Sequence, residues 1–108
     1  MDVLDRIKAT LAQHQVVLFM KGTPKFPMCG FSSRALQALR DAGAQFEAVN
    51  VLEDPALRAS LPRFANWPTF PQLFIQGELI GGCEIIEDLH ASGQLARIVA
   101  DLHAEAAE

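Results

Sequence analysis

The stretch VVLFMKGTPKFPMCGFSSRALQALRDAGAQFEAVNV, residues 16–51, decides the fold of this chain. Its first five residues, 16–20, are branched and apolar, and they predict a buried strand. Residues 30–42 repeat apolar side chains at helical spacing, and Gly43 is a suitable stop signal for a helix. Residues 46–51 predict the next strand. Because a strand–helix–strand connection is right-handed, the two strands should lie parallel in one sheet.

Further elements are predicted on both sides of this unit by apolar periodicity, capping residues and turn residues. They are a helix at 3–13, a helix at 54–64 opened by Asp54-Pro55, a hairpin of 72–75 and 79–80 around Gly77-Glu78, and a helix at 84–102 broken near Ser92-Gly93. The apolar face of the helix at 30–42 should consist of Phe31, Ala35, Leu36 and Leu39. The expected fold class is therefore α/β, a four-stranded mixed sheet flanked by helices, in one domain over residues 1–108. This architecture matches the thioredoxin-like class.

Composition narrows the kind of protein. The chain of 108 residues is 50% apolar and 20% charged, as expected for one globular domain. Its longest unbroken apolar run has five residues, whereas a membrane span needs about 18. The net charge of −4 argues against nucleic acid as a partner. A targeting segment would be basic where this chain has Asp2 and Asp5. Two cysteines are too few for a disulfide framework, so we expect a reducing, cytoplasmic setting.

Charge is unevenly distributed along the chain. Residues 84–108 carry six acids against one arginine, whereas residues 20–40 carry no acid and four bases, Lys21, Lys25, Arg34 and Arg40. A positive segment within an acidic protein indicates either a site for a small anion or uneven decoration of solvated surface.

Cys29 is the candidate reactive group. It follows a predicted strand and a proline-containing loop, and it opens a predicted helix. The unpaired N–H groups and the positive dipole end of a helix favour a thiolate over a thiol, and the nearby bases Lys21, Lys25 and Arg34 favour it too. A thiolate attacks disulfides and binds metal. The alternative is a buried structural cysteine, which the adjacent glycine, prolines and basic residues do not favour.

Ser32 stands where dithiol oxidoreductases carry a second cysteine, so a mixed disulfide at Cys29 has no resolving thiol within the motif. Disulfide exchange of the dithiol kind should therefore be poor. The Ser32 hydroxyl should either hydrogen-bond the neighbouring sulfur or cap the helix.

Two later segments carry binding groups. In residues 67–72, a cis Phe70–Pro71 bond would leave the backbone of Phe70 free to pair with an extended peptide, while the alternative is a rigid turn with core aromatics. In residues 80–84, paired glycines and a helix N-terminus would hold a carboxylate, and Glu84 an ammonium group. The alternative there is a plain turn, with Cys83 as a small packed residue.

Together these segments resemble the monothiol glutaredoxins of the CGFS type. The matching segments are Lys21-Gly22-Thr23-Pro24, Pro27-Met28-Cys29-Gly30-Phe31-Ser32, Trp67-Pro68-Thr69-Phe70-Pro71-Gln72 and Gly81-Gly82-Cys83-Glu84, and the resemblance runs from about Val3 to Leu102. It implies the thioredoxin-like fold, glutathione binding, and a [2Fe–2S] cluster held between two subunits and passed to other proteins.

By this resemblance, Cys29 would be both the reactive thiol and the cluster ligand. The residues implied to contact glutathione are Lys21, Arg58, Phe70, Cys83 and Glu84. Phe70 and Cys83 would act through backbone groups. The family usually has Asp at the position of Glu84, and the assignment of Arg58 rests on the resemblance alone.

A [2Fe–2S] cluster typically needs four thiolate ligands. Cys29 from two chains and two glutathione thiolates complete the set, which fits a symmetric homodimer. A rival set uses Cys29 and Cys83 of both chains without glutathione.

The leading hypothesis is a carrier that transfers clusters to apo acceptor proteins in iron–sulfur assembly and iron homeostasis, with weak or no oxidoreductase turnover. The alternative is a glutathione-dependent thiol–disulfide oxidoreductase that removes glutathione from mixed disulfides through Cys29. A third reading is a regulatory module that pairs with a BolA-like protein across a shared cluster, as the resemblance implies.

Overall fold

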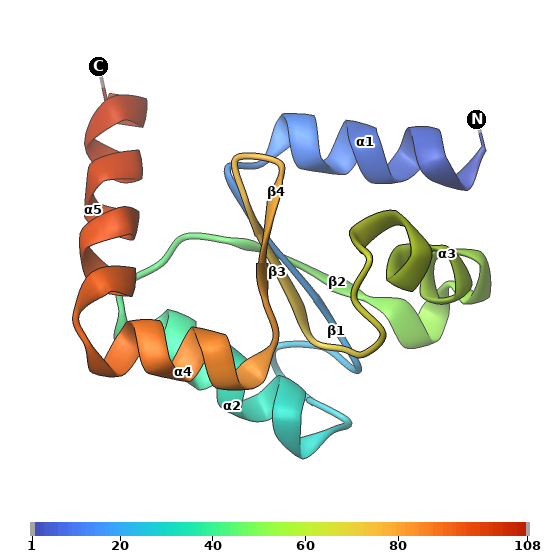
Figure 1. The fold of residues 1–108 in the computed structure, drawn as a ribbon, viewed down its shortest axis with the longest axis horizontal. Coiled ribbons are helices and arrows are strands. Elements are labelled where there is room, and N and C mark those ends of the chain that lie inside the picture. The colour runs from blue at the N-terminus through green and yellow to red at the C-terminus, as the bar shows by residue number, and fades with distance from the viewer. Residues whose placement is uncertain (1, 108) are drawn as a thin grey trace.

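A computed structural model describes residues 2–107 of the chain (Figure 1). A four-stranded sheet with strand order β2-β1-β3-β4 forms its centre. In chain order the elements are α1 (Val3–Gln13), β1 (Val16–Met20), α2 (Gly30–Asp41), β2 (Glu47–Asn50), the short 3-10 helix η1 (Val51–Glu53), α3 (Pro55–Ala65), β3 (Gln72–Ile75), β4 (Glu78–Gly81), α4 (Cys83–Ala91) and α5 (Gln94–Ala107). Strands β1 and β2 are parallel, while β3 is antiparallel to both β1 and β4, so the mixed sheet expected from the sequence is confirmed.

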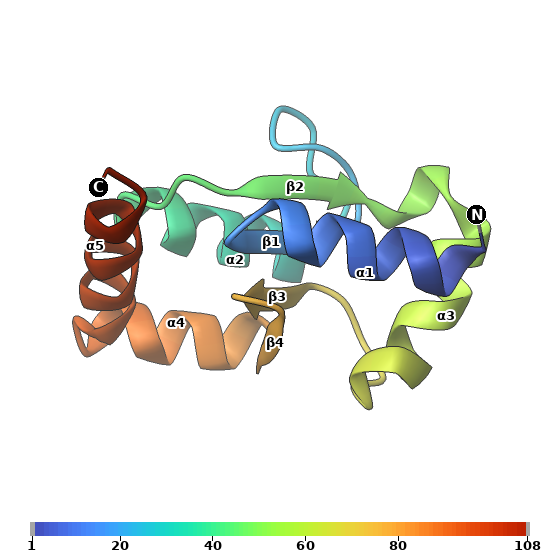
Figure 2. The same cartoon turned by 90° about the horizontal axis from the view of Figure 1, so that it is seen from above.

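The core is divided by the sheet into two halves. Because side chains alternate along a strand, Leu18 and Met20 of β1 pack against α2, α4 and α5, whereas Val17 and Phe19 pack against α1 and α3. Figures 1 and 2 show the two groups of helices on opposite sides of the strands. Phe19 meets Phe74 of β3 edge to face, with ring centroids 5.6 Å apart. All five residues of β1 are buried, which explains its unbroken apolar sequence.

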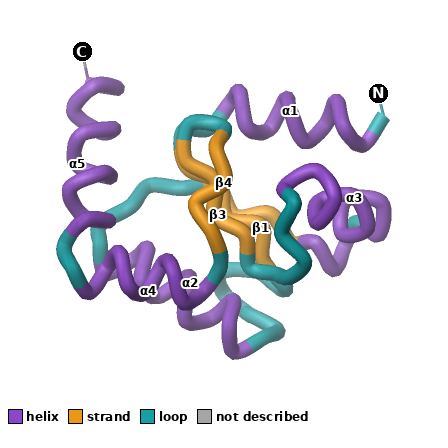
Figure 3. Tube along the Cα trace, viewed as in Figure 1, coloured by secondary structure: helices purple, strands orange, loops and turns teal. Residues whose placement is uncertain are grey.

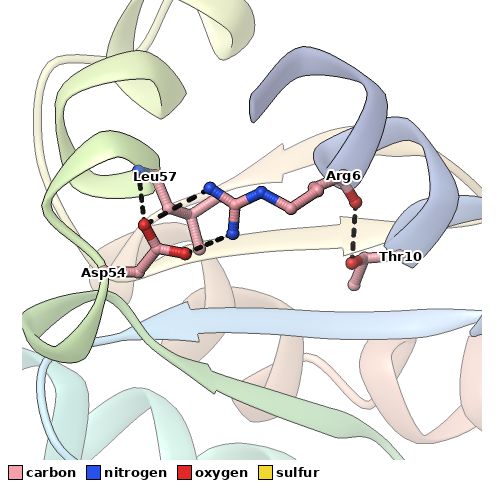
Figure 4. Close-up of polar contacts among 4 residues, drawn as sticks. All are labelled: Arg6, Thr10, Asp54 and Leu57. Atoms are coloured by element: carbon pink, nitrogen blue, oxygen red, sulfur yellow. Dashed lines mark hydrogen bonds and ion pairs between the residues drawn. The ribbon is translucent and has the colours of Figure 1, made fainter. Parts of the chain in front are cut away.

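The N-terminus of α3 is built as the sequence predicts. Asp54 caps the helix by accepting a hydrogen bond from the backbone N–H of Leu57 at 3.1 Å, and Pro55 occupies the first helical position. The same carboxylate forms an ion pair with Arg6 of α1 (Figure 4). One aspartate therefore ends the 3-10 segment, begins α3 and ties α3 to α1.

Two local expectations were wrong. The hairpin turn lies at Gln76-Gly77 rather than Gly77-Glu78, because both Gln76 and Gly77 have positive φ, 50° and 80°, and Glu78 pairs with Ile75. Phe31 is not part of the apolar face of α2: it is 55% exposed, and Ser32 is buried instead. The predicted helix break is confirmed at Gly93, where φ is 82°. No helix within residues 2–107 is long and apolar enough to cross a membrane.

Candidate functional site

The sheet register brings three loop segments to one end of the molecule. Phe19 near the end of β1 pairs with Gln72 at the start of β3, and Leu73 pairs with Gly81 at the end of β4. The connections 21–29, 67–71 and 82–83 therefore leave the sheet at the same end, as the tube in Figure 3 shows. These are the three segments in which the sequence placed its candidate groups.

Cys29 lies at the N-cap position of α2, with extended backbone at φ −154° and ψ 135°, and its side chain is half-buried. The pKa of its thiol is lowered, mainly by the backbone N–H of Ser32. The N–H of Phe31 and the charge of Lys21 also lower this pKa, while partial burial opposes them. The predicted effect of a helix N-terminus on Cys29 is therefore present, and the side chain is partly exposed to solvent.

Hydrogen bonds close the loop before Cys29 on itself. The backbone N–H of Met28 donates to the carbonyl of Lys21 at 2.9 Å, and Thr23 and Phe26 exchange two backbone hydrogen bonds of 3.1 Å. Gly22 has φ 97°, and a Cβ on it would lie 2.5 Å from both Met28 N and Phe26 O, so this position needs a glycine. The loop thus presents Phe26 and Met28, 72% and 68% exposed, beside Cys29.

Ser32 is fully buried and ties α2 to the end of β1. Its hydroxyl oxygen accepts a hydrogen bond of 3.1 Å from the backbone N–H of Lys21. This hydroxyl has the smallest of the effects that lower the pKa of Cys29, and α2 has no side-chain cap at its N-terminus. Hydrogen bonding to the sulfur and capping of the helix are therefore not the main roles of Ser32. Its hydroxyl chiefly fixes the backbone of Lys21, directly after β1.

A groove of about 350 Å³, a size typical of small-molecule sites, lies between the segment before β3 and the start of α4. Its lining residues are Phe31, Trp67, Thr69, Phe70, Pro71, Gly82, Cys83, Glu84 and Ile85. The Phe70–Pro71 peptide bond is cis, as the peptide-binding alternative requires. Both aromatic side chains of this segment, Trp67 and Phe70, are half-buried and line the groove.

Cys83 differs chemically from Cys29. It is the first residue of α4, is 6% exposed, and donates a hydrogen bond of 3.5 Å from its sulfur to Oε1 of Glu87. Burial is the main cause of a raised pKa for its thiol, and Glu87 raises this pKa further. The surroundings of Cys29 thus favour the thiolate, whereas those of Cys83 favour the neutral thiol.

The structure brings together some of the predicted binding residues and leaves one apart. Phe70, Cys83 and Glu84 line the groove, and Lys21 and Cys29 bracket the loop at the same end of the sheet. Arg58 is exposed on α3 and does not line the groove. Two lining residues were not predicted from the sequence: Phe31 belongs to a matching segment but was expected on the apolar face of α2, and Ile85 belongs to no motif.

Two of the four bases in residues 20–40 have partners within the chain. Arg34 forms an ion pair with Glu87, and Arg40 donates to the carbonyl of Pro24 at 3.3 Å. Within residues 2–107, no group of three or more His, Cys, Asp or Glu side chains is arranged to hold a metal ion.

A mixed sheet with helices on both sides, a cysteine at the start of the helix after the first strand, and a cis-proline before the third strand define the thioredoxin-like class. Residues 16–80 match the glutaredoxin family. Glutaredoxin 4 of Pasteurella multocida is 48% identical over 105 residues, which cover 97% of this chain and 96% of that protein. The chain belongs to the glutaredoxin family.

Solved structures agree with this assignment. The reduced apo form of poplar GrxS14 is 44% identical, with 94% of each chain covered and a TM-score of 0.80. The glutaredoxin in a buckwheat glutaredoxin–glutathione complex is 24% identical and shares the fold, with a TM-score of 0.79. The match covers 92% of this chain and 88% of the buckwheat chain. The predicted thioredoxin-like fold is thereby confirmed.

Proposed function

We propose that this glutaredoxin binds glutathione and a [2Fe–2S] cluster between two copies of the chain, and transfers the cluster to apo acceptor proteins in the cytoplasm. The observation that carries the proposal is the chemistry of Cys29. It is a half-buried cysteine whose pKa is lowered, and the position of a resolving cysteine is filled by the buried Ser32. Such a site favours holding a thiolate ligand over dithiol exchange.

Glutathione is the small ligand that fits the groove chemically. The free N–H groups at the start of α4 suit a carboxylate, and exposed Glu84 suits an ammonium group, so a peptide bearing both finds partners there. The backbone of Phe70, before the cis peptide bond, would pair with the cysteinyl residue of glutathione. Lys21 and Arg58 would supply positive charge to the glycyl carboxylate, and for Arg58 this requires contact beyond the groove.

The cluster is treated as cargo that four thiolates would hold. Each chain offers Cys29, whereas Cys83 is buried and donates its hydrogen bond to Glu87, so it is a poor ligand. Two glutathione thiolates would complete the set in a symmetric homodimer. Nothing lies within 4 Å of a Cβ placed on Gly30, and exposed Phe26 and Met28 add apolar surface beside Cys29, which supports a second chain docking at this face.

Acceptor proteins and a BolA-like partner would use the same face, because the cluster must be reached through Cys29. In this proposal the chain acts in iron–sulfur cluster assembly and iron homeostasis. Its own oxidoreductase turnover is weak.

A second candidate function uses the same groups. The lowered pKa of Cys29 beside a peptide-sized groove also suits removal of glutathione from mixed disulfides. In that reaction the Cys29 thiolate attacks the glutathione sulfur and the substrate thiol leaves, and a second glutathione then reduces the mixed disulfide to regenerate Cys29 and form glutathione disulfide.

Anaerobic reconstitution with iron, sulfide and glutathione separates the two functions. A visible charge-transfer spectrum together with a dimeric mass is expected of the carrier. The Cys29→Ser variant, and a sample prepared without glutathione, should remain colourless and monomeric. Cys83→Ser should load nearly normally, whereas the rival ligand set requires it to lose the cluster. A colourless monomer that deglutathionylates quickly would contradict the carrier proposal.

A further inference from the structure

Arg34, Glu87 and Cys83 form a chain of polar contacts between α2 and α4. Arg34 donates to both carboxylate oxygens of Glu87, with a distance of 3.2 Å from Nε to Oε2. The Cys83 thiol donates to Oε1 of the same carboxylate at 3.5 Å. One carboxylate therefore links an arginine of the helix that follows Cys29 with the buried thiol that begins α4.

Three charged groups act on the Cys83 sulfur. Glu84 and Glu87 belong to α4, Arg34 belongs to α2, and the segment 67–71, which lines the same groove, has no charged residue. Burial stabilises the neutral thiol, and so does a carboxylate that accepts a hydrogen bond from it. Arg34 acts in the opposite direction, since a cation near sulfur favours the thiolate. Besides burial, the protonation of Cys83 thus depends on how far Arg34 offsets Glu87.

We propose that Glu87 is a positioning residue that holds Cys83 as a neutral hydrogen-bond donor, so that Cys29 is the thiolate of the site. Paired with Arg34, the Glu87 carboxylate is fixed where it accepts a hydrogen bond from the Cys83 thiol. The inference rests on the proposed function only in assigning Cys83 to the glutathione groove, and its test needs neither glutathione nor a cluster.

The consequence is chemical selectivity between two cysteines in one site. A second thiolate at the start of α4 would compete with Cys29 for iron and for electrophiles. A neutral thiol at this position instead packs as a small apolar residue and leaves the backbone N–H of Cys83 free for a ligand. Glu87 would therefore act on function through Cys83, without touching the ligand.

The test measures Cys83 alone, in a Cys29→Ser background, because the chain has two cysteines. Thiolate absorbance in the ultraviolet, followed against pH, gives the titration midpoint. Glu87→Gln keeps the side-chain shape and an acceptor oxygen but leaves Arg34 without an opposite charge, so the midpoint should fall by about one pH unit or more. Alkylation by iodoacetamide at a fixed pH below the midpoint should quicken, by up to about tenfold per unit.

Arg34→Gln provides the opposite perturbation. It removes the cation and leaves the Glu87 carboxylate facing the thiol, so the midpoint should rise and alkylation should slow. Asp88→Asn is the matched control, because Asp88 is an exposed acid on the same helix, and it should change neither value.

A purely structural ion pair would give a different pattern. Both variants would then lower the melting temperature and leave the midpoint unchanged, or move it in the same direction by loosening α4. Either result would overturn the role of Glu87. Failure of cluster reconstitution would contradict the proposed function and leave these opposite shifts intact, so the two failures can be told apart.

Discussion

Replacing Ser32 with alanine should cost stability and leave the chemistry of Cys29 almost unchanged. The Ser32 hydroxyl is buried and accepts the Lys21 backbone N–H at 3.1 Å, so alanine leaves that donor without its partner. An unsatisfied buried donor costs about 1–3 kcal/mol, and Lys21, which carries this donor, is half-buried, so we expect a loss of about 1–2 kcal/mol. For a chain of this size that loss lowers Tm by roughly 4–12 °C.

The thiol of Cys29 should respond much less. The main cause of its lowered pKa is the backbone N–H of Ser32, which alanine retains, and the hydroxyl has the smallest effect. Thermal and urea denaturation measure stability, and the pH dependence of alkylation measures the thiolate. Ser33→Ala is the control, since Ser33 is exposed on the same helix. A Ser32→Ala protein that is as stable as the parent but alkylates slowly at Cys29 would refute this reasoning.

Two further predictions concern the loop and the α1–α3 contact. Gly22→Ala should destabilise the protein by more than about 1 kcal/mol in urea unfolding, because its Cβ would lie 2.5 Å from backbone atoms. Gly43→Ala, also at positive φ but in open space, should cost less, and equal losses would contradict the close approach. The pKa of Asp54 is lowered mainly by Arg6, so its stabilisation is complete above about pH 4 and disappears as pH falls through the lower folded-state value. The Tm difference between the parent and Asp54→Asn should accordingly be largest at neutral pH and shrink in acid; a difference independent of pH would contradict this assignment.

Most of the fold could be predicted because its signals are local. Five consecutive apolar residues marked β1, and Asp54-Pro55 marked the start of α3 within a residue. The hairpin turn was misplaced by one residue, because glutamine at position 76 carries no sign that it adopts positive φ. Such a conformation is imposed by strand pairing rather than by residue type.

The sequence indicated which segments carry the site residues, but not which side chains contact one another. Cys29, Phe70 and Cys83 were each predicted to border a strand or helix, and the structure brings these borders to one end of the sheet. The pairing of Arg34 with Glu87 was missed, since 53 residues separate them and either charge alone suits an exposed helix. Helical periodicity also put Phe31 in the core. The first turn of α2 leaves it exposed at the rim of the groove instead.

The hydrogen-bonded loop before Cys29 has a consequence for the energetics of association. Its backbone is already fixed by bonds within residues 21–28 and by one from Gly22 N–H to the side-chain oxygen of Asn50 at 2.9 Å. The entropy of ordering this segment is lost during folding, so it need not be lost again when a second molecule docks. A molecule that binds at Cys29 therefore contacts a loop that is already ordered. Its residence time should depend on the contacts it makes rather than on a rearrangement of the loop.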